Sequence, residues 1–313
     1  MRIGVDIMGS DHGPVVPIAA AVLAASELPA GVRLVLIGDP SVIAAGLKEH
    51  GADVGAFDIV PSEGDITFDD NPTKALQAKP KSSISIGFHL LKEGKLDAFA
   101  STGNTGAMLV GSIFSVKPIP GVIRPCIPSV VPKENGSYGI LVDVGANADC
   151  KPDVLAQVGL LGAMLAKHVY HIDDPKVGLL NIGEEAKKGD LLRQVTYELM
   201  KDQQAYRFIG NVEGRDLFND KADVMVTDGF TGNVVLKAVE AFHDLLEQRG
   251  VHEPFFDRFN YENYGGLPVL GVNGNVIIGH GISNIATTKN MILFTREVVE
   301  SRLSDRIREA ITQ

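Results

Sequence analysis

Short apolar runs that end in glycine, asparagine or aspartate recur along the whole chain, and stretches with helical spacing of apolar residues follow them. Such runs are typical of buried strands in a parallel sheet, and the longer periodic stretches predict helices. The strand-to-helix junctions fall in eight segments, at 3–13, 34–40, 97–106, 139–147, 176–185, 208–214, 223–233 and 275–284. Helices are expected between them, for example over 153–168, 191–201, 234–248 and 286–303.

This alternation predicts right-handed crossovers and an α/β fold in which a mostly parallel, doubly wound sheet lies in α-β-α layers. Residues 117–132 contain five prolines in 16 residues, and proline is excluded from helix interiors and central strands. That segment is therefore expected to be a connector or an arm between two halves of the sheet. Residues 295–313 are expected to form one amphipathic surface helix.

Composition and charge narrow the class of protein. Of the 313 residues, 45% are hydrophobic and 22% are charged, which is ordinary for a globular chain. The 29 basic and 39 acidic residues give a net charge of −10, which argues against nucleic acid as the main ligand. The two cysteines, Cys126 and Cys150, are too few for a disulfide framework or a zinc cluster, and a reducing cytoplasm is the simplest setting. No apolar stretch approaches the roughly 18 residues of a spanning helix, so any membrane contact is expected to be peripheral.

Two junctions are candidates for anion sites. "STGNTGA" at 101–107 and "DGFTGNVVLK" at 228–237 each place glycine, threonine and asparagine where a strand gives way to a helix. A helix N-terminus offers unpaired N–H groups that favour an anion. No lysine follows Gly106, so the nucleotide P-loop is absent and phosphate is favoured over ATP. The alternative is that the glycines only permit turns and the polar side chains only cap helices. If both junctions belonged to one sheet, they would face each other across a crevice at its carboxyl edge.

Further polar residues follow other predicted strands. Lys187 and Lys188 come after two glutamates in "NIGEEAKKGD" and form either a local positive field or a solvated helix start. Asn147 and His280 also lie in expected strand-end loops. The dinucleotide fingerprint and the serine-hydrolase elbow are both missing, and no spacing of histidines and carboxylates suggests a metal site.

Several motifs taken in order resemble one known family, the acyl-ACP:phosphate acyltransferases (PlsX). They are "DIMGSDHGP", "NPTKALQAKPKSSI", "STGNTGA", "GVIRPCIP", "LVDVGAN", "VGLLNIGEEAKKG", "FIGNVEGRD", "DVMVTDGFTGNVVLK" and "YGGLPVLGVNG…HGISN". The resemblance covers essentially the full chain, and "GNVEGRD" and "DGFTGNVVLK" are its most specific parts.

The resemblance implies a reversible transfer of a fatty acyl group from acyl carrier protein to inorganic phosphate, which gives acyl-phosphate for phospholipid synthesis. It implies the fold of the isocitrate/isopropylmalate dehydrogenases with two interlocked lobes, which we place at 1–116 with 266–313 and at 117–265. It implies a cytoplasmic homodimer that needs no metal or cofactor and contacts the inner face of the cell membrane. A glycerol-phosphate acyltransferase would take the product.

The family's chemistry makes phosphate itself the nucleophile, so the protein has to hold phosphate and stabilise an oxyanion. The residues expected at the phosphate and the oxyanion are Ser101, Gly103, Asn104, Thr105, Asn147, Asp228, Thr231 and Asn233. Asn104, Asp228 and Asn233 are the expected catalytic residues among them, together with His280, which would donate to the oxyanion or to the departing thiolate. Lys187 and Lys188 are expected to add positive charge.

The sequence departs from the family in two places. Ser10 stands where the family has glycine, and the region 242–264, a longer basic and apolar helical pair in the family, is shortened here. The shortened region keeps a group of aromatic residues suited to packing or to a lipid interface: Phe255, Phe256, Phe259, Tyr261 and Tyr264. The competing hypotheses are a short-chain phosphotransacetylase that acts on acyl-CoA, a non-catalytic scaffold for lipid synthesis, and a decarboxylating dehydrogenase of the same fold.

Overall fold

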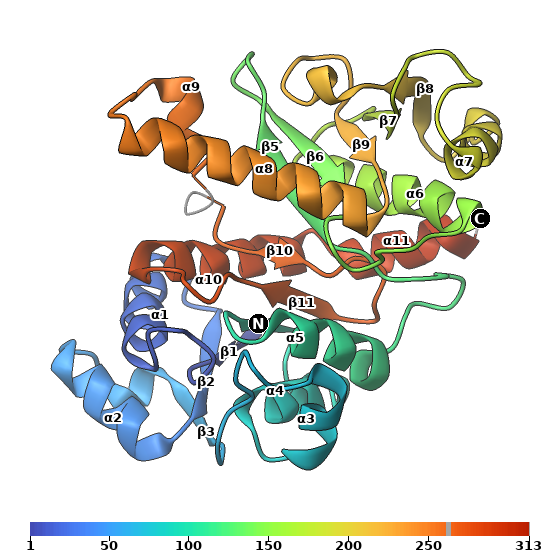
Figure 1. Ribbon diagram of the computed structural model, residues 1–313. Helices are drawn as coiled ribbons and strands as arrows, with labels where there is room; N and C mark the ends of the chain where they lie inside the picture. The colour runs from blue at the N-terminus through green and yellow to red at the C-terminus, as the bar shows by residue number, and fades with distance from the viewer. Residues whose placement is uncertain (261–263, 313) are drawn as a thin grey trace. The chain divides into compact units, whose positions relative to one another are not determined.

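The computed structural model describes residues 1–260 and 264–312, and Tyr261 of the aromatic group lies outside them. The chain forms two compact units, Met1–Pro118 with Glu262–Ser301 and Ile119–Tyr261 with Arg302–Gln313 (Figure 1). Each unit has its own sheet. The lobes expected from the sequence differ from these units mainly at the C-terminus, because helix α11 (Leu303–Thr312) packs on a helix of the second unit.

The sheet of the first unit has six strands in the order β10-β11-β4-β1-β2-β3, and all neighbours are parallel except β10 and β11. The strands are β1 (Arg2–Asp6), β2 (Arg33–Gly38), β3 (Asp58–Pro61), β4 (Ala98–Ser101), β10 (Leu267–Pro268) and β11 (Asn275–Ile278). Nearly every residue of β1, β2 and β4 is buried. These central strands therefore have helices on both faces, as their continuous apolar runs indicate.

The helices of the first unit form two groups, α1 with α2 and α10, and α3 with α4 and α5, whose members contact one another. They are α1 (Val15–Glu27), α2 (Pro40–Glu49), α3 (Pro72–Ala78), α4 (Ser83–Lys92), α5 (Thr105–Gly111) and α10 (Ile285–Glu300), with the short helices η1 (Val54–Ala56) and η2 (Ser112–Val116). Polar side chains begin most of them: Asp39, Asn71, Ser82, Asn104 and Asn284 each accept a backbone N–H of the first turn.

The strand order of the first sheet reverses at β1 and β4. The chain runs from β1 outward through β2 to β3, and then returns to β4 on the other side of β1. The loops that leave β1 and β4 therefore diverge, and a ligand-binding crevice in this class of fold lies at such a point, outside the carboxyl ends of the strands. The "STGNTGA" loop begins there.

The sheet of the second unit has five strands in the order β5-β6-β9-β7-β8, parallel except for the edge strand β5. They are β5 (Pro128–Pro132), β6 (Tyr138–Val142), β7 (Lys176–Leu180), β8 (Arg207–Val212) and β9 (Val224–Val226). β5 comes from the proline-rich segment and lies at the edge of the sheet, where β6 is its one neighbour among the described strands. An edge position tolerates the missing N–H groups of its prolines.

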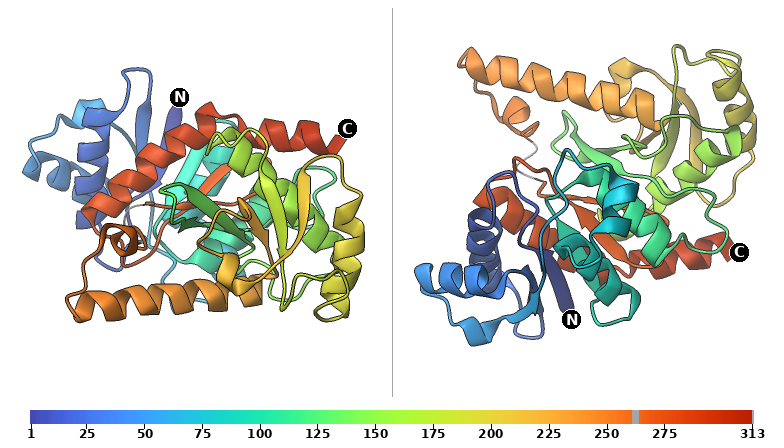
Figure 2. Two further views of the ribbon diagram at one scale, coloured as in Figure 1. Left: turned by 90° about the horizontal axis from the view of Figure 1, so that it is seen from above. Right: turned by 60° about the horizontal axis from the view of Figure 1, so that its bottom comes forward.

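The helices of the second unit are α6 (Pro152–His168), α7 (Leu191–Lys201), α8 (Gly229–Gln248), α9 (Pro254–Asp257) and α11, with the short helix η3 (Gly214–Asp216). α6 packs against α7, α11 and three strands, whereas α8 buries only Gly229 and Gly232. Both views in Figure 2 show α9 beside the carboxyl end of α8.

The predicted helices are present, with two differences. α8 begins at Gly229 and not at residue 234, because Asp228 caps it inside the glycine motif. The single terminal helix expected over 295–313 is wrong, because Arg302 has a φ of 55° and separates α10 from α11. Leu303 and Ile307 are then buried in the second unit, although the sequence suggested a solvated surface helix.

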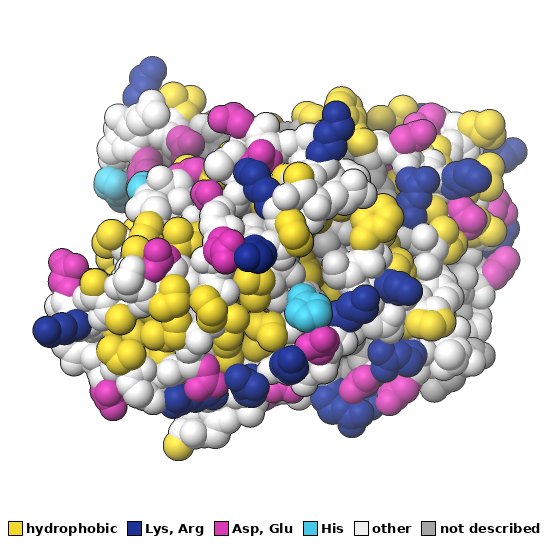
Figure 3. Space-filling view, turned by 90° about the horizontal axis from the view of Figure 1, so that it is seen from below, with side chains coloured by type: hydrophobic (Ala, Val, Ile, Leu, Met, Phe, Trp, Pro, Cys, Tyr) yellow, Lys and Arg dark blue, Asp and Glu magenta, His cyan; other side chains and the backbone are white. Residues whose placement is uncertain are grey.

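Charged and hydrophobic side chains share the described surface (Figure 3). On the face shown in Figure 3, Lys and Arg side chains alternate with Asp and Glu side chains, and exposed hydrophobic side chains lie among them. In the part of the chain that the structure describes, no helix combines the length and the apolar character that a membrane crossing requires.

Candidate active site

The loops after β1 and β4 are joined by a buried carboxylate. Asp6, the last residue of β1, accepts hydrogen bonds from the Ser101 hydroxyl at 2.6 Å and from the Met8 N–H at 3.0 Å. The Ser101 hydroxyl in turn accepts the Gly103 N–H at 2.9 Å. Burial raises the pKa of the Asp6 carboxyl above its ordinary value, and the hydrogen bonds oppose that rise. Ser101 is fully buried, so it orders the loop from inside.

The same two loops touch through glycine backbones. A Cβ atom on Gly9 would lie 2.7 Å from the Gly103 Cα atom and 2.4 Å from an Asp6 carboxylate oxygen. Real Cβ contacts do not become this short, so only glycine lets the loops approach at the switch point. This contact explains the glycine at position 9 without any ligand, whereas a Cβ atom on Gly103 would lie 3.2 Å from the Gly9 Cα atom, which is tight but less severe.

Asn104 begins α5 and uses its side chain within the protein. Its Oδ1 accepts the Ala107 N–H at 2.9 Å, and its Nδ2 donates to the Thr67 carbonyl at 2.8 Å. Its side chain therefore caps the helix and ties it to the 67–70 loop. Thr105, the first residue of α5, is exposed. The first N–H groups of a helix lack partners within the helix, so Thr105 and Gly106 present backbone donors at this edge.

The loop after β11 joins the same edge. Ile278 of β11 pairs with Ser101, and the Gly279 N–H donates to the Ser101 carbonyl at 2.8 Å. The next residue, His280, is exposed and follows directly. A further bond from the Asp11 N–H to the Gly281 carbonyl, 3.1 Å long, ties this loop to the loop after β1. His280 thus lies at the carboxyl edge that carries Ser101 and Gly103.

A second buried carboxylate orders the loop after β6 in the second unit. Asp143 accepts four hydrogen bonds, from the N–H groups of Ile127, Ala146 and Asn147 and from the Asn147 side chain, at 2.7–3.1 Å. Burial raises its pKa, and these bonds work against the rise. The Asn147 side chain also donates to the Pro125 carbonyl at 2.7 Å, and its carbonyl accepts the Gly229 N–H at 2.8 Å. Asn147 therefore connects the β6 loop to the start of α8.

The "DGFTGN" motif forms the first turn of α8. Asp228 accepts both the Thr231 N–H and the Thr231 hydroxyl at 2.8 Å. A Cβ atom on Gly232 would lie 1.9 Å from the Asp143 carbonyl oxygen, so this position has to be glycine. Asn233 donates to the Val144 carbonyl at 3.3 Å. The motif thus packs α8 directly on the loop after β6.

Arg193 of α7 adds a cation that no motif indicated. Its guanidinium pairs with Asp228, lies 3.3 Å from the Thr231 hydroxyl and binds Asp190, the cap of α7, at 2.9 Å. Burial alone would raise the pKa of Asp228, but the hydrogen bonds from Thr231 and the Arg193 charge outweigh burial and lower that pKa. Arg193 therefore joins the N-termini of α7 and α8.

The loop after β7 brings two more cations to this edge of the second sheet. The Lys188 carbonyl accepts the Asn181 side chain at 3.1 Å, so the loop that carries Lys187 and Lys188 is held to the end of β7. Both lysines are exposed. The Lys188 ammonium lies 3.9 Å from Glu185, whereas no carboxylate of the described residues lies within 4.0 Å of the Lys187 ammonium.

The sequence comparisons decide the family. The family described as "Fatty acid synthesis protein" matches residues 1–306. A phosphate acyltransferase of Cyanothece sp. is 39% identical over 326 residues, which cover 98% of this chain and 94% of the relative. Another, from Syntrophomonas wolfei, is 40% identical over 288 residues and 90% of each chain. The chain belongs to this family.

Solved structures support the fold of the family. The EutD phosphotransacetylase from Staphylococcus aureus aligns with a TM-score of 0.63 at 15% identity and covers 96% of this chain and 94% of its own. A phosphotransacetylase from Streptococcus pyogenes gives a TM-score of 0.63 at 17% identity, with 100% and 94% of the two chains covered. The expected α/β class is confirmed.

The family residues expected at the site divide between the two units. Four of them and His280 gather at one edge of the first sheet: Ser101, Gly103, Asn104 and Thr105. The others gather at one edge of the second sheet: Asn147, Lys187, Lys188, Asp228, Thr231 and Asn233. The two glycine motifs thus belong to two sheets and not to one. Among the described residues, no group of three or more His, Cys, Asp and Glu side chains could hold a metal ion.

Three residues that order these edges are not among the site residues expected from the sequence, although Asp143 was already placed at a strand end beside Asn147. Asp6 is the last residue of β1 and Asp143 directly follows β6, and both are buried carboxylates that order a glycine-containing loop. An aspartate that directly follows a continuous apolar run was the available signal for both. Arg193 gave no such signal, because its partners come from two separate loops.

Proposed function

We propose that this protein transfers a fatty acyl group from acyl carrier protein to inorganic phosphate, as a phosphate acyltransferase. A phosphate oxygen attacks the thioester carbonyl carbon, the C–O bond forms, the C–S bond breaks, and the carrier leaves as a thiolate that takes up a proton. The products are acyl-phosphate and free carrier. The reaction is reversible because both the thioester and the acyl-phosphate are activated acyl groups.

The observation that carries this proposal is the identity of 36–40% to curated phosphate acyltransferases over 90–100% of the chain. The phosphotransacetylases share the fold at only 15–17% identity, so a short-chain reaction on acyl-CoA is not favoured. A scaffold without activity is not favoured either, because the polar groups at both strand edges are all present.

The residues of the first unit are suited to hold an anion through backbone donors. Asn104 and Ser101 use their side chains to order the loop, so we assign their contribution to position and not to direct contact. The Gly103 N–H is already bonded to the Ser101 hydroxyl, so Gly103 would shape the loop. The donors to phosphate would be the N–H groups of Thr105 and Gly106 and the Thr105 hydroxyl, beside a helix N-terminus. His280 would donate a proton to the oxyanion or to the departing thiolate.

The residues of the second unit are suited to add positive charge. Lys187 is exposed, and Lys188 is weakly paired. Asp228 repels phosphate in isolation, but Arg193 neutralises it, so its role would be to fix Thr231 and the first turn of α8. Asn233 would present the second hydrogen of its amide, and Asn147 would hold the loop on which α8 rests.

The partners follow from the same proposal. The substrate is delivered by acyl carrier protein, and the product passes to a glycerol-phosphate acyltransferase on the inner face of the cell membrane. Exposed apolar side chains along α8, among them Phe230, Val234 and Leu245, support a homodimer or a peripheral membrane contact. No resident metal or cofactor is part of the proposal, since phosphate supplies the nucleophile.

The test follows labelled phosphate. Purified protein, palmitoyl-carrier protein and isotope-labelled phosphate should give a labelled acyl-phosphate that hydroxylamine converts to a hydroxamate. Asn233→Ala should lower the rate while the fold, measured by circular dichroism, is retained. Label that stays in inorganic phosphate while the carrier thiol is released would mean hydrolysis, and would overturn the proposal.

A further inference from the structure

An apolar groove lies between α8 and α9 in the second unit. Its volume is about 350 Å³, within the range of small-molecule sites, which are mostly apolar. Ten side chains line it: Phe218, Val235, Ala238, Val239, Phe242, His243, Leu246, Phe255, Phe256 and Phe259. Nine of these are apolar, and Phe242 is still 57% exposed. Burying so much apolar surface is favourable, so the groove is suited to an apolar ligand.

The groove continues the face of α8 that begins at the candidate site. Residues four apart on a helix lie one above the other, so Thr231, Val235 and Val239 form one line, which Phe242 and Leu246 extend. Thr231 contacts Asp228 and Arg193. Leu246 is 15 residues further along, which corresponds to about 22 Å of helix. One end of this line is therefore polar and charged, and the remainder is apolar.

The opposite wall of the groove is built by aromatic rings. Phe259 packs edge-on against Phe218 and Phe255, with ring centroids 5.1 and 5.2 Å apart. The Phe255 and Phe256 rings are 5.6 Å apart. Phe218 follows η3, so these contacts join the α9 segment to the body of the second unit.

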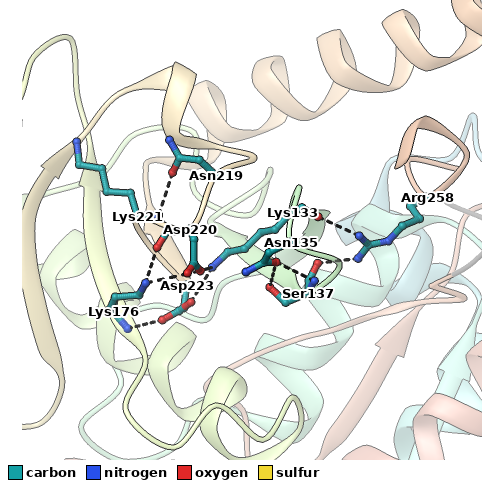
Figure 4. Close-up of polar contacts among 9 residues, drawn as sticks. All are labelled: Lys133, Asn135, Ser137, Lys176, Asn219, Asp220, Lys221, Asp223 and Arg258. Carbon is teal, nitrogen blue, oxygen red and sulfur yellow. Dashed lines mark hydrogen bonds and ion pairs between the residues drawn. The ribbon is translucent and has the colours of Figure 1, made fainter. Parts of the chain in front are cut away.

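Arg258 fixes this wall to the sheet (Figure 4). Its guanidinium donates to the Lys133 carbonyl at 3.0 Å and the Ser137 carbonyl at 2.6 Å, on the turn between β5 and β6. The Lys133 side chain is 1% exposed and pairs with Asp223 at 2.7 Å, so the turn itself is anchored in the unit. Arg258 also lies 4.7 Å from the centre of the Tyr138 ring. The groove thus has two walls that the structure holds in place.

We propose that the groove between α8 and α9 binds the hydrocarbon chain of the acyl substrate, with the thioester at the Thr231 end. This proposal rests on the proposed function. It adds where the acyl chain binds and why the enzyme would prefer long acyl chains. A fatty acyl group has a polar reacting end and an apolar tail, and the α8 face has the same polarity along its length. The groove then selects long chains, because each buried methylene increases affinity about four-fold.

The test places a larger side chain in the groove by substitution. Ala238 lines the groove and is exposed, so Ala238→Phe fills it without displacing a buried side chain. Ala241 is exposed on the same helix and lies outside the lining, so Ala241→Phe is the matched control. The measurement is kcat/KM for phosphate-dependent thiol release from palmitoyl- and butyryl-carrier protein, with the oligomeric state followed by sedimentation.

Ala238→Phe should lower the ratio of palmitoyl to butyryl activity about ten-fold, which is the loss of roughly two buried methylenes, and Ala241→Phe should leave the ratio unchanged. Arg258→Gln, which releases the α9 wall, should lower the same ratio while butyryl transfer is retained.

An unchanged ratio in Ala238→Phe overturns the proposed binding site for the acyl chain. A changed oligomeric state with an unchanged ratio assigns the groove to a second copy of the chain and also overturns it. If the unaltered protein transfers neither acyl group to phosphate, the proposed function fails, and that outcome is distinct from an unchanged ratio in an active enzyme.

Discussion

The contact between Arg193 and Asp228 gives the sharpest prediction for the second unit. Their side chains are 14% and 7% exposed, so the pair lies between a surface ion pair, worth under about 1 kcal/mol, and a buried one, whose disruption costs about 3–5 kcal/mol. Arg193→Met leaves the Asp228 carboxylate without its cation. We expect the free energy of unfolding to fall by about 2–3 kcal/mol.

The assay is a double-mutant cycle with Asp228→Asn, followed by circular dichroism in urea. The chain has two compact units, which can unfold separately. If the urea curve shows two transitions, each transition is fitted with its own unfolding free energy. The cycle should give a coupling energy of about 1.5–3 kcal/mol. Arg207→Met is the control, since Arg207 and Asp174 form an exposed pair, 57% and 68% exposed, and it should cost less than about 1 kcal/mol. A coupling below about 0.5 kcal/mol would refute the reasoning, because contacting residues that stabilise each other do not add independently.

The same pair predicts a pH dependence. The folded state lowers the pKa of Asp228 below its ordinary value of 3.8, so the stabilisation is present above pH 3.8 and is lost as the pH falls through the lower, folded pKa. The difference in unfolding free energy between the unaltered protein and Asp228→Asn should therefore shrink in acid. A difference that stays constant from neutral pH to below pH 3.8 would contradict the assigned ion pair.

Three further substitutions test single contacts. Gly232→Ala places a methyl group 1.9 Å from a backbone carbonyl oxygen and should prevent soluble expression or cost more than about 3 kcal/mol, whereas Gly214→Ala, with open space around it, should be nearly neutral in the same urea titration. Ser101→Ala removes the donor to a buried carboxylate and should cost about 1–3 kcal/mol, with a raised KM for phosphate; an unchanged KM would separate that hydroxyl from the site. His280→Ala should lower kcat about 100-fold with little change in KM, and an unaltered kcat would exclude His280 from the chemistry.

Much of the fold follows from the chain's local pattern. Continuous apolar runs predict buried parallel strands, and β1, β4 and β9 are such strands. The strand order does not follow from the runs, because pairing depends on contacts between distant segments. That is why "STGNTG" and "DGFTGN" could be assigned to strand ends but not to separate sheets.

The position of the candidate site could also be predicted from the sequence, but its side-chain contacts could not. A glycine motif marks where a loop has to pass close to another backbone, as Gly232 does beside Asp143. The motif does not show which polar side chains are already occupied. Asn104 was expected to contact phosphate. Only the three-dimensional structure shows that its side chain bonds to the 67–70 loop and to the first turn of α5. Arg193 shows the same limit, because Asp228 and Thr231, the partners that link it to α8, are 35 and 38 positions away in sequence.

Acyl transfer to phosphate is measured directly by the release of free thiol with and without phosphate, from palmitoyl-carrier protein and from acetyl-CoA at equal concentration. We expect phosphate-dependent release from palmitoyl-carrier protein, matched by an equal amount of acyl-phosphate, and little release from acetyl-CoA. Release from acetyl-CoA alone, or none from either substrate, would contradict this expectation.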